Sequence, residues 1–311
     1  MNQSYLDTVR LLIEAAPALF EGTVFALKGG TALNLFVQEL PRLSVDLDLV
    51  YTDSAPRRDE ALANISAQLA AAKARLEALG LAAELPANVA GDEAKLFVSN
   101  DVARVKVEVN HVFRGTALPI ERRGLARAAQ DLFAANIELP LLQEAEIYGS
   151  KLVAAMDRQH PRDIFDVQVL LRAGGISNSM LDCFVLYLAG HNRPLHEVLF
   201  PKRKNIAGLF ESDFQGITTV PVGLDELEAT RAQLQDSLPR SLSATHRDFL
   251  LSFVRLEPAW ELVPFPHAQQ LPALQWKLEN LRRLRSTSRA RFLDQYGILS
   301  RLLDATKQQQ G

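Results

Sequence analysis

Two aspartates, Asp46 and Asp48, are the residues whose type and spacing point most directly to chemistry. They lie in the segment RLSVDLDL, where apolar and polar residues alternate as along a half-buried strand. Side chains at i and i+2 of a strand project from the same face, so the two carboxylates would repel each other unless a cation neutralised them. Oxygen ligands of this kind suit Mg²⁺ or Mn²⁺. The pair predicts a divalent metal site, although two acids on the wet face of an edge strand would give the same pattern.

A third acid could complete this site. The segment VARVKVEVN also alternates, and Val105, Val107 and Val109 would face the core while Glu108 lies on the polar face. Acids from neighbouring strands form the two-metal clamps that are used for phosphoryl transfer. We therefore expect Asp46, Asp48 and Glu108 to be the metal ligands.

A glycine pair comes shortly before the acids. The segment from Thr23 to Leu27 is typical of a strand, Gly29 and Gly30 follow it, and a helical pattern begins at Thr31. Glycines at such a junction let backbone N–H groups approach a phosphate, Thr31 can add a hydroxyl, and Lys28 adds a cation. A double glycine alone is more often just a turn. Together with the acid pair, however, it favours a site for a nucleoside triphosphate.

A second group of charged residues lies further along the chain, in KLVAAMDRQHPRDIFDV. Lys151 and Arg158 are seven residues apart on an expected helix and share a face, and a lysine there could neutralise a triphosphate. After Pro161, a favourable first residue of a helix, Asp163 and Asp166 lie one turn apart. Either acid could be a general base or could position Lys151; surface ion pairs are the simpler alternative.

The elements that must position these residues change character along the chain. Up to about residue 115, expected helices over 5–20 and 56–79 alternate with strands, whereas 144–158, 162–172 and most residues after 225 read as helices. The stretch 201–223 reads as a loop. We predict an α+β protein with a core domain over 1–140, a mixed sheet with flanking helices, followed by a mostly helical domain over 141–311. That second domain would contribute Lys151 and Asp163 or Asp166 to the site.

Composition narrows the class of protein. The one cysteine, Cys183, allows no intramolecular disulfide and no Cys-based zinc site, which fits a reducing cytoplasm. The sequence contains no uncharged apolar run long enough to span a membrane, so we expect no membrane span. The net charge of −3 gives no general attraction to polyanions, so a nucleic acid would need a local basic patch. The stretch from Lys277 to Phe292 is such a patch, or simply the basic side of a surface helix.

Taken together, LKGGTALNLF, RLSVDLDL, VKVEVN and KLVAAMDRQHPRDIFDV resemble the AbiEii/AbiGii family of nucleotidyltransferase toxins, which includes the mycobacterial MenT toxins. The tail EPAWELVPFPHAQQLPALQWKLENLRRL also resembles longer members of this family. The resemblance implies a polymerase-β-like nucleotidyltransferase core followed by a helical bundle. By position it assigns the nucleotide-gripping turn to Gly29, Gly30 and Thr31. Many members of the wider superfamily have Gly-Ser at the glycine pair.

The same resemblance implies roles for the other residues. Asp46 and Asp48 match the metal-binding acids, Lys151 matches the catalytic lysine, and Asp163 or Asp166 matches the late acid. The family implies the toxin half of a toxin–antitoxin or phage-defence pair, with a cognate antitoxin as partner. It also implies NTP as substrate, Mg²⁺ or Mn²⁺ as cofactor, and transfer of a nucleotide to the 3′ end of tRNA, which blocks translation. The resemblance does not assign the tRNA contacts; from the basic stretch Lys277 to Phe292, we expect Arg282, Arg283, Arg285 and Arg289 to contact the tRNA.

Two alternatives stay open at the level of sequence. The same chemistry could act on a small molecule or a protein side chain, and the net charge of −3 mildly favours such an acceptor. The fold could also serve as a non-catalytic module that binds a nucleotide or a partner. A non-catalytic module would explain why this chain has Gly29-Gly30 in place of Gly-Ser, but it would leave the set of acids and Lys151 unexplained.

Overall fold

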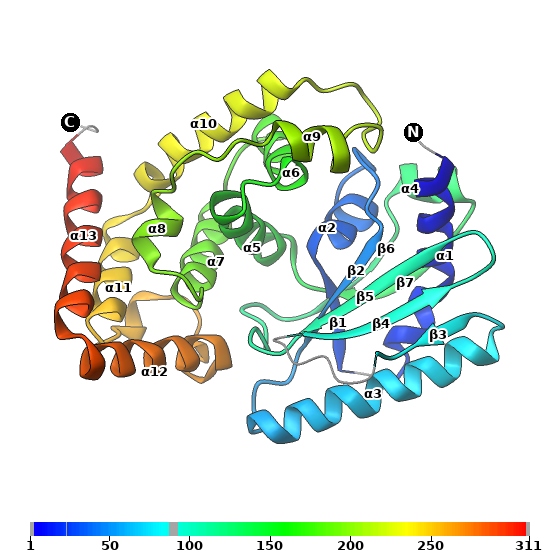
Figure 1. Cartoon of the computed structure of the whole chain (residues 1–311), viewed down its shortest axis with the longest axis horizontal. Helices are drawn as coiled ribbons and strands as arrows, with labels where there is room; N and C mark the ends of the chain where they lie inside the picture. Colours follow the sequence, from blue (N-terminus) through cyan, green and yellow to red (C-terminus); the bar gives the residue numbers. More distant parts are fainter. Residues whose placement is uncertain (1–2, 23, 87–92, 309–311) are drawn as a thin grey trace. The chain divides into compact units, whose positions relative to one another are not determined.

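The computed structural model describes residues 3–22, 24–86 and 93–308. The chain forms two compact units (Figure 1): Met1–Ile147 with Gln215–Pro221, and Tyr148–Phe214 with Val222–Gly311. The first unit contains the sheet and its flanking helices, and the second is helical. The predicted fold class, α+β with a mixed sheet followed by a mostly helical region, is confirmed.

The described residues of the first unit form a sheet of seven strands in the order β3-β4-β5-β2-β1-β7-β6. The pairs β2–β5 and β1–β7 are parallel and the other neighbours are antiparallel, so the sheet is mixed. The expected strand from Thr23 starts outside the described residues, and the observed strand begins at Phe25. The strands are β1 (Phe25–Lys28), β2 (Asp46–Tyr51), β3 (Ala82–Glu84), β4 (Glu93–Ser99), β5 (Arg104–Asn110), β6 (Glu121–Gly124) and β7 (Glu138–Leu141).

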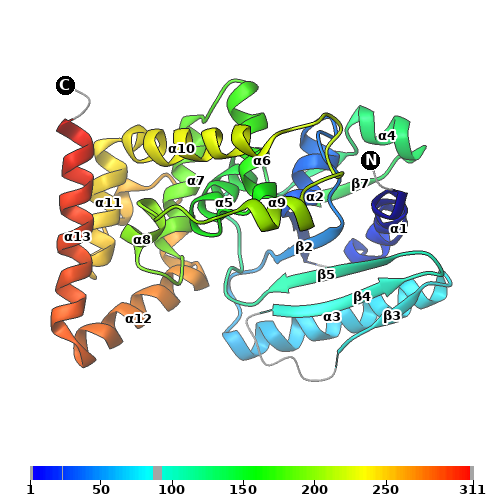
Figure 2. The ribbon, with the colours of Figure 1, turned by 45° about the horizontal axis from the view of Figure 1, so that its top comes forward.

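The alternation in β2 and β5 separates an apolar face from a polar face. Leu47 and Leu49 are fully buried, as are the three valines of β5, whereas the acids between them are half-buried. Helices α1 (Gln3–Phe20) and α3 (Arg58–Ala78) pack against each other, α1 against β5 and α3 against β4 (Figure 2). Burial of the apolar side chains beneath these helices leaves the polar side chains on the opposite face of the sheet.

The remaining elements of the first unit lie at the ends of the strands. A short helix α2 (Gly29–Ala32) continues into a π-helical turn, η1 (Leu33–Val37), and packs on β2. Helix α4 (Arg127–Phe133) separates β6 from β7, and α5 (Glu144–Asp157) begins at the end of this unit. Residues 215–221 also belong here, because the Leu43 amide donates to the Ile217 carbonyl (2.8 Å) and Thr219 donates to Pro41 (3.0 Å).

The second unit consists of helices and short turns. Helix α6 pairs with α10, and α13 packs on α8, α11 and α12. Helix α9 lies within 201–223, which the sequence predicts to be a loop; with seven residues it is too short for helical periodicity to emerge. The helices are α6 (Pro161–Arg172), α7 (Asn178–Ala189), α8 (Leu195–Leu199), α9 (Ala207–Asp213), α10 (Leu224–Ser241), α11 (Ala244–Val254), α12 (Pro272–Thr287) and α13 (Arg289–Gln308), with 3-10 turns η2 (Trp260–Leu262) and η3 (Ala268–Gln270).

Within the described part of the chain, none of the helices has both the length and the apolar character that a membrane crossing requires.

One buried lysine makes the stability of the second unit depend on pH. Lys277, on α12, is 5% exposed, and its ammonium group donates to the carbonyl oxygens of Asn192 (3.3 Å) and Arg193 (2.7 Å). Burial lowers the pKa of Lys277 to about 8, with Glu197 acting in the opposite direction. Because the folded state releases this proton at a lower pH than the unfolded chain, this lysine makes the free energy of unfolding rise with pH between these two pKa values.

We expect that rise to be at most about 3 kcal/mol between pH 8 and 10.5 for this one group. Lys277→Met should flatten the dependence, whereas Lys73→Met, on α3, should not. Both tryptophans, Trp260 and Trp276, lie in the second unit, so their fluorescence during urea unfolding reports its stability. Parallel pH profiles for the wild type and Lys277→Met would contradict the assignment.

Candidate active site

The register of three adjacent strands brings the expected site residues of the first unit together. Asp48 on β2 pairs with Lys28 on β1 and with Glu108 on β5. Asp46 pairs with Lys106 on β5. Directly opposed residues of neighbouring strands point to the same side of a sheet, so Asp46, Asp48 and Glu108 share the polar face.

The turn after β1 lies directly against this acid strand. Gly29 has a φ of +74°, and a Cβ at this position would overlap the carboxylate of Asp48. A Cβ at Gly30 would lie 2.9 Å from Arg42 Nη2 and 3.0 Å from Ser44 Oγ. The first glycine is therefore required by both backbone conformation and space. At the second, the space for a side chain is already taken by Arg42 and Ser44.

Thr31 ties the turn to β2. Its side chain is fully buried, and its hydroxyl donates to the carbonyl oxygen of Asp46 and hydrogen-bonds the Ser44 hydroxyl (3.0 Å). We expected this hydroxyl to contact a phosphate. In the structure its hydrogen bonds join the turn to the backbone of Asp46, and a role in binding phosphate stays a prediction.

Two lysines that sequence reasoning passed over neutralise Glu108. Lys106 Nζ lies 3.1 Å from Glu108 Oε2 and 3.9 Å from Asp46 Oδ1, and Lys95 Nζ lies 3.3 Å from Glu108 Oε1. Burial alone would raise the pKa of Glu108, but the hydrogen bonds and charges of Lys106 and Lys95 lower it. Burial likewise opposes the charge of Lys106, yet Asp46 and Glu108 raise its pKa. The alternation in VKVEV already places Lys106 and Glu108 on one face, so the sequence could have predicted this ion pair.

The oxygen donors on the polar face show which of the predicted ligands fit a divalent metal ion. Asp46 and Asp48 are half-buried oxygen donors on one face, which suits Mg²⁺ or Mn²⁺. Glu108 is held by its lysines, and the described residues contain no group of three or more His, Cys, Asp or Glu arranged to hold a metal ion. The two aspartates therefore fit a divalent ion, whereas both carboxylate oxygens of Glu108 already contact lysines.

In the second unit, one buried lysine lies between two aspartates. Lys151, on α5, is 7% exposed, and its Nζ lies 2.8 Å from Asp163 Oδ1 and 2.9 Å from Asp166 Oδ2. Arg158 contacts the other oxygen of Asp163 (2.8 Å). The sequence left open which aspartate accompanies Lys151, and in the structure both do. Paired to the same ammonium, both carboxylates act on its position.

Local packing explains why these residues meet. A Cβ at Gly149 would run into Cys183 and the backbone of α7, so this glycine lets α5 and α7 approach closely and sets the position of the next turn. Helix α6 begins at Pro161, and the preceding His160 accepts a hydrogen bond from the Arg162 amide (3.1 Å). Burial, with Arg162, lowers the pKa of His160, which favours the neutral ring that this cap requires.

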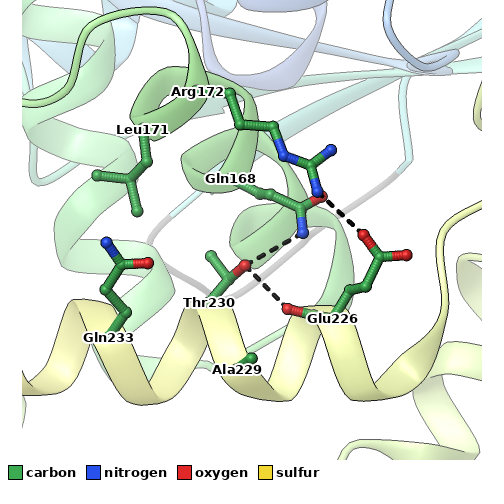
Figure 3. Close-up of a pocket in the computed structure, with 7 residues that line it drawn as sticks. All are labelled: Gln168, Leu171, Arg172, Glu226, Ala229, Thr230 and Gln233. Atoms are coloured by element: carbon green, nitrogen blue, oxygen red, sulfur yellow. Dashed lines mark hydrogen bonds and ion pairs between the residues drawn. The ribbon is translucent and has the colours of Figure 1, made fainter.

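The second unit also contains a pocket that involves none of the predicted site residues (Figure 3). It has a volume of about 270 Å³ and lies between α6 and α10, beside the ion pair of Arg172 and Glu226 (2.9 Å). Gln168, 5% exposed, donates to the Thr230 hydroxyl there (3.1 Å), and its carbonyl oxygen has no protein partner. The four expected tRNA-contacting arginines lie elsewhere in this unit, exposed on α12 and α13.

The close approach at Gly29 gives a test with a matched control. Gly29 and Gly80 both have a positive φ (+74° and +82°), but a Cβ at Gly80 meets nothing within 4 Å. Alanine should therefore cost each variant about 1–2 kcal/mol of backbone strain. Gly29→Ala should lose a further 1–3 kcal/mol, roughly, because it also displaces Asp48. Urea unfolding followed by circular dichroism measures both, and equal losses would contradict the contact.

Comparison with known proteins is consistent with this geometry. Residues 10–280 match the family model described as the nucleotidyl transferase AbiEii toxin of type IV toxin–antitoxin systems. Among solved structures, the fold is similar to MenT4, a nucleotidyltransferase toxin from Mycobacterium tuberculosis H37Rv, with a TM-score of 0.56 and 20% identity over 89% of this chain and 91% of that one. No curated protein matches the sequence. The family model covers most of the chain and confirms the resemblance, so this protein belongs to the AbiEii family of nucleotidyltransferase toxins.

Proposed function

We propose that this protein transfers a nucleoside monophosphate from an NTP to the 3′-terminal hydroxyl of a tRNA, releasing pyrophosphate and blocking translation. A cognate antitoxin would restrain it. The observation that carries the proposal is the contact between the Gly29 backbone and the Asp48 carboxylate, on the face that also holds Asp46. A triphosphate held by the turn would lie beside the acids, as nucleotidyl transfer requires.

Each residue of the first unit has a definite role in this proposal. The backbone N–H groups at Gly29 and Gly30 would bind the β- and γ-phosphates, with Lys28 as a nearby cation. Asp46 and Asp48 would hold Mg²⁺ or Mn²⁺. When bound, this ion would supply positive charge to the triphosphate. Thr31 would position Asp46 through its hydrogen bond to the backbone.

Lys151 would act as a fixed positive charge. Its contacts with Asp163 and Asp166 hold the ammonium in one place, so it suits neutralisation of the leaving pyrophosphate better than proton abstraction. The two aspartates would position the lysine. This assignment extends the sequence resemblance and remains a prediction.

An acceptor screen tests the proposed substrate. The purified full-length protein is incubated separately with total tRNA, a protein extract and small hydroxylated metabolites, each with the four α-³²P-labelled NTPs. We expect label in tRNA, lost when the 3′-terminal hydroxyl is removed by periodate oxidation. Label that enters only protein or small molecules would refute the tRNA acceptor while leaving the transfer chemistry in place.

The acid pair is tested in the same assay. Asp46→Asn and Asp48→Asn preserve shape and remove one charge each, and we expect label transfer to fall at least on the order of 100-fold. Asp131→Asn, an exposed acid on α4 paired with Arg127, is the control and should transfer normally. Folding is checked by circular dichroism. Transfer at wild-type rates in both site variants would exclude the proposed metal site.

The role of Lys151 can be separated from its contribution to folding. Lys151→Met removes the cation between the buried Asp163 and Asp166, of which Asp163 keeps its contact with Arg158, and should destabilise the protein by about 3–5 kcal/mol. Combining it with Asp166→Asn removes one buried charge, so stability should partly return while transfer stays lost. If the double variant recovers transfer together with stability, Lys151 has a structural role only.

A further inference from the structure

The polar face of the sheet continues beyond the acids onto β5 and β4. Phe97 pairs with Lys106, which pairs with Asp46, and Lys95 pairs with Glu108 in the next row. All of these residues are half-buried on the face opposite α1 and α3. This face therefore carries an aromatic ring and two ammonium groups next to the proposed reaction centre.

An exposed arginine adds to this surface. Arg104, on β5, places its guanidinium carbon 4.3 Å from the centre of the Phe97 ring and pairs with Glu84 (3.0 Å). Both partners of that pair are well exposed, with 56% and 70% of their side-chain surface accessible, so the ion pair contributes little to stability. An arginine stacked on an aromatic ring offers a nucleobase a flat cationic surface.

The geometry of in-line attack places the acceptor on the β5 and β4 side of Asp46 and Asp48. In nucleotidyl transfer the acceptor oxygen bonds to the α-phosphorus, the bond from that phosphorus to the bridging β-oxygen breaks, and pyrophosphate leaves with the electron pair while the hydroxyl proton passes to water. Attack in line requires the acceptor opposite the leaving group. The glycine turn lies at β1, on one side of Asp46 and Asp48, so the acceptor must approach from the other side, over β5 and β4.

We propose that Lys95, Phe97, Arg104 and Lys106 form the binding site for the 3′-terminal nucleotide of a single-stranded nucleic acid acceptor. The terminal base stacks on Arg104 and Phe97, and the adjoining phosphate pairs with Lys106 and Lys95. Phe97 lies two strands from Asp46, about 10 Å across the sheet, which places the base beside the reacting hydroxyl. This site rests on the proposed function. It places the 3′ end of the acceptor on β4 and β5, whereas the sequence analysis expected the acceptor to contact the arginines of α12 and α13.

The chain offers a matched control for Arg104. Arg122, on β6, is also an exposed strand arginine paired with a glutamate on the adjacent strand, Glu138 (2.6 Å). It lies at the opposite part of the sheet, beyond β1 and β7. Arg104→Gln and Arg122→Gln therefore make the same change of charge in the same kind of ion pair.

The test measures binding of a fluorescein-labelled single-stranded RNA decamer with a free 3′ hydroxyl to the full-length protein, without NTP, by fluorescence anisotropy. We expect Arg104→Gln and Phe97→Leu each to weaken binding roughly 5- to 150-fold, the range for loss of one stacked base. Arg122→Gln should leave the affinity unchanged. Equal losses for the two arginine variants, or wild-type affinity in Phe97→Leu, would overturn the proposed site.

The transfer assay separates failure of this site from failure of the function. For the wild-type protein, initial rates of label transfer to the same decamer give the KM for the acceptor and the KM for NTP. Arg104→Gln and Phe97→Leu should raise KM for the acceptor and leave KM for NTP unchanged. If the wild type labels the RNA but both variants keep the same acceptor KM, this site is wrong and the function stands. If the wild type labels only protein or small molecules, this site and the tRNA acceptor both fall, and only the transfer chemistry stands.

Discussion

The close contact between the Gly29 backbone and the Asp48 carboxylate is the constraint on which the candidate site of the first unit depends. A left-handed φ and the absence of a side chain are both needed there, which only glycine provides at low cost. The buried Thr31 hydroxyl joins the same turn to the Asp46 carbonyl, so turn and acid strand are held together at two points. A triphosphate bound by the turn would consequently be placed by backbone geometry and not by flexible side chains.

In each unit, one lysine lies between two carboxylates and neutralises part of their charge. Lys106 lies between Asp46 and Glu108, and Lys151 lies between Asp163 and Asp166. The first lysine is half-exposed, so water screens its contacts. The second is buried, and breaking its pairs would leave uncompensated charges in the interior. The same arrangement is thus hydrated in one unit and buried in the other. For a chain with a net charge of −3, this local pairing matters more than the overall field.

Membership of the AbiEii family defines the reaction class, and the details of this chain explain how it departs from the wider superfamily. Where many members have Gly-Ser, this protein has Gly29-Gly30, and Arg42 and Ser44 take the space that a side chain at position 30 would need. A hydroxyl is therefore present at this point, but it comes from Ser44, in the segment just before β2. The similarity to MenT4 shows that the fold is kept at 20% sequence identity.

Periodicity in the sequence was enough to predict the main helices, the two strands that carry the acids, and the faces on which Asp46, Asp48 and Glu108 lie. Local patterns determine these features, because the side-chain period of a strand or helix is independent of what packs against it. Strands β3, β4, β6 and β7 were missed, three of them with only three or four residues, too few to show a pattern. Only the tertiary structure decided which strands are neighbours. Strand register placed Lys95 and Lys106 against Glu108, and packing buried Thr31 and paired Lys151 with both aspartates. Such partners are brought together by long-range contacts, which one-dimensional spacing does not encode.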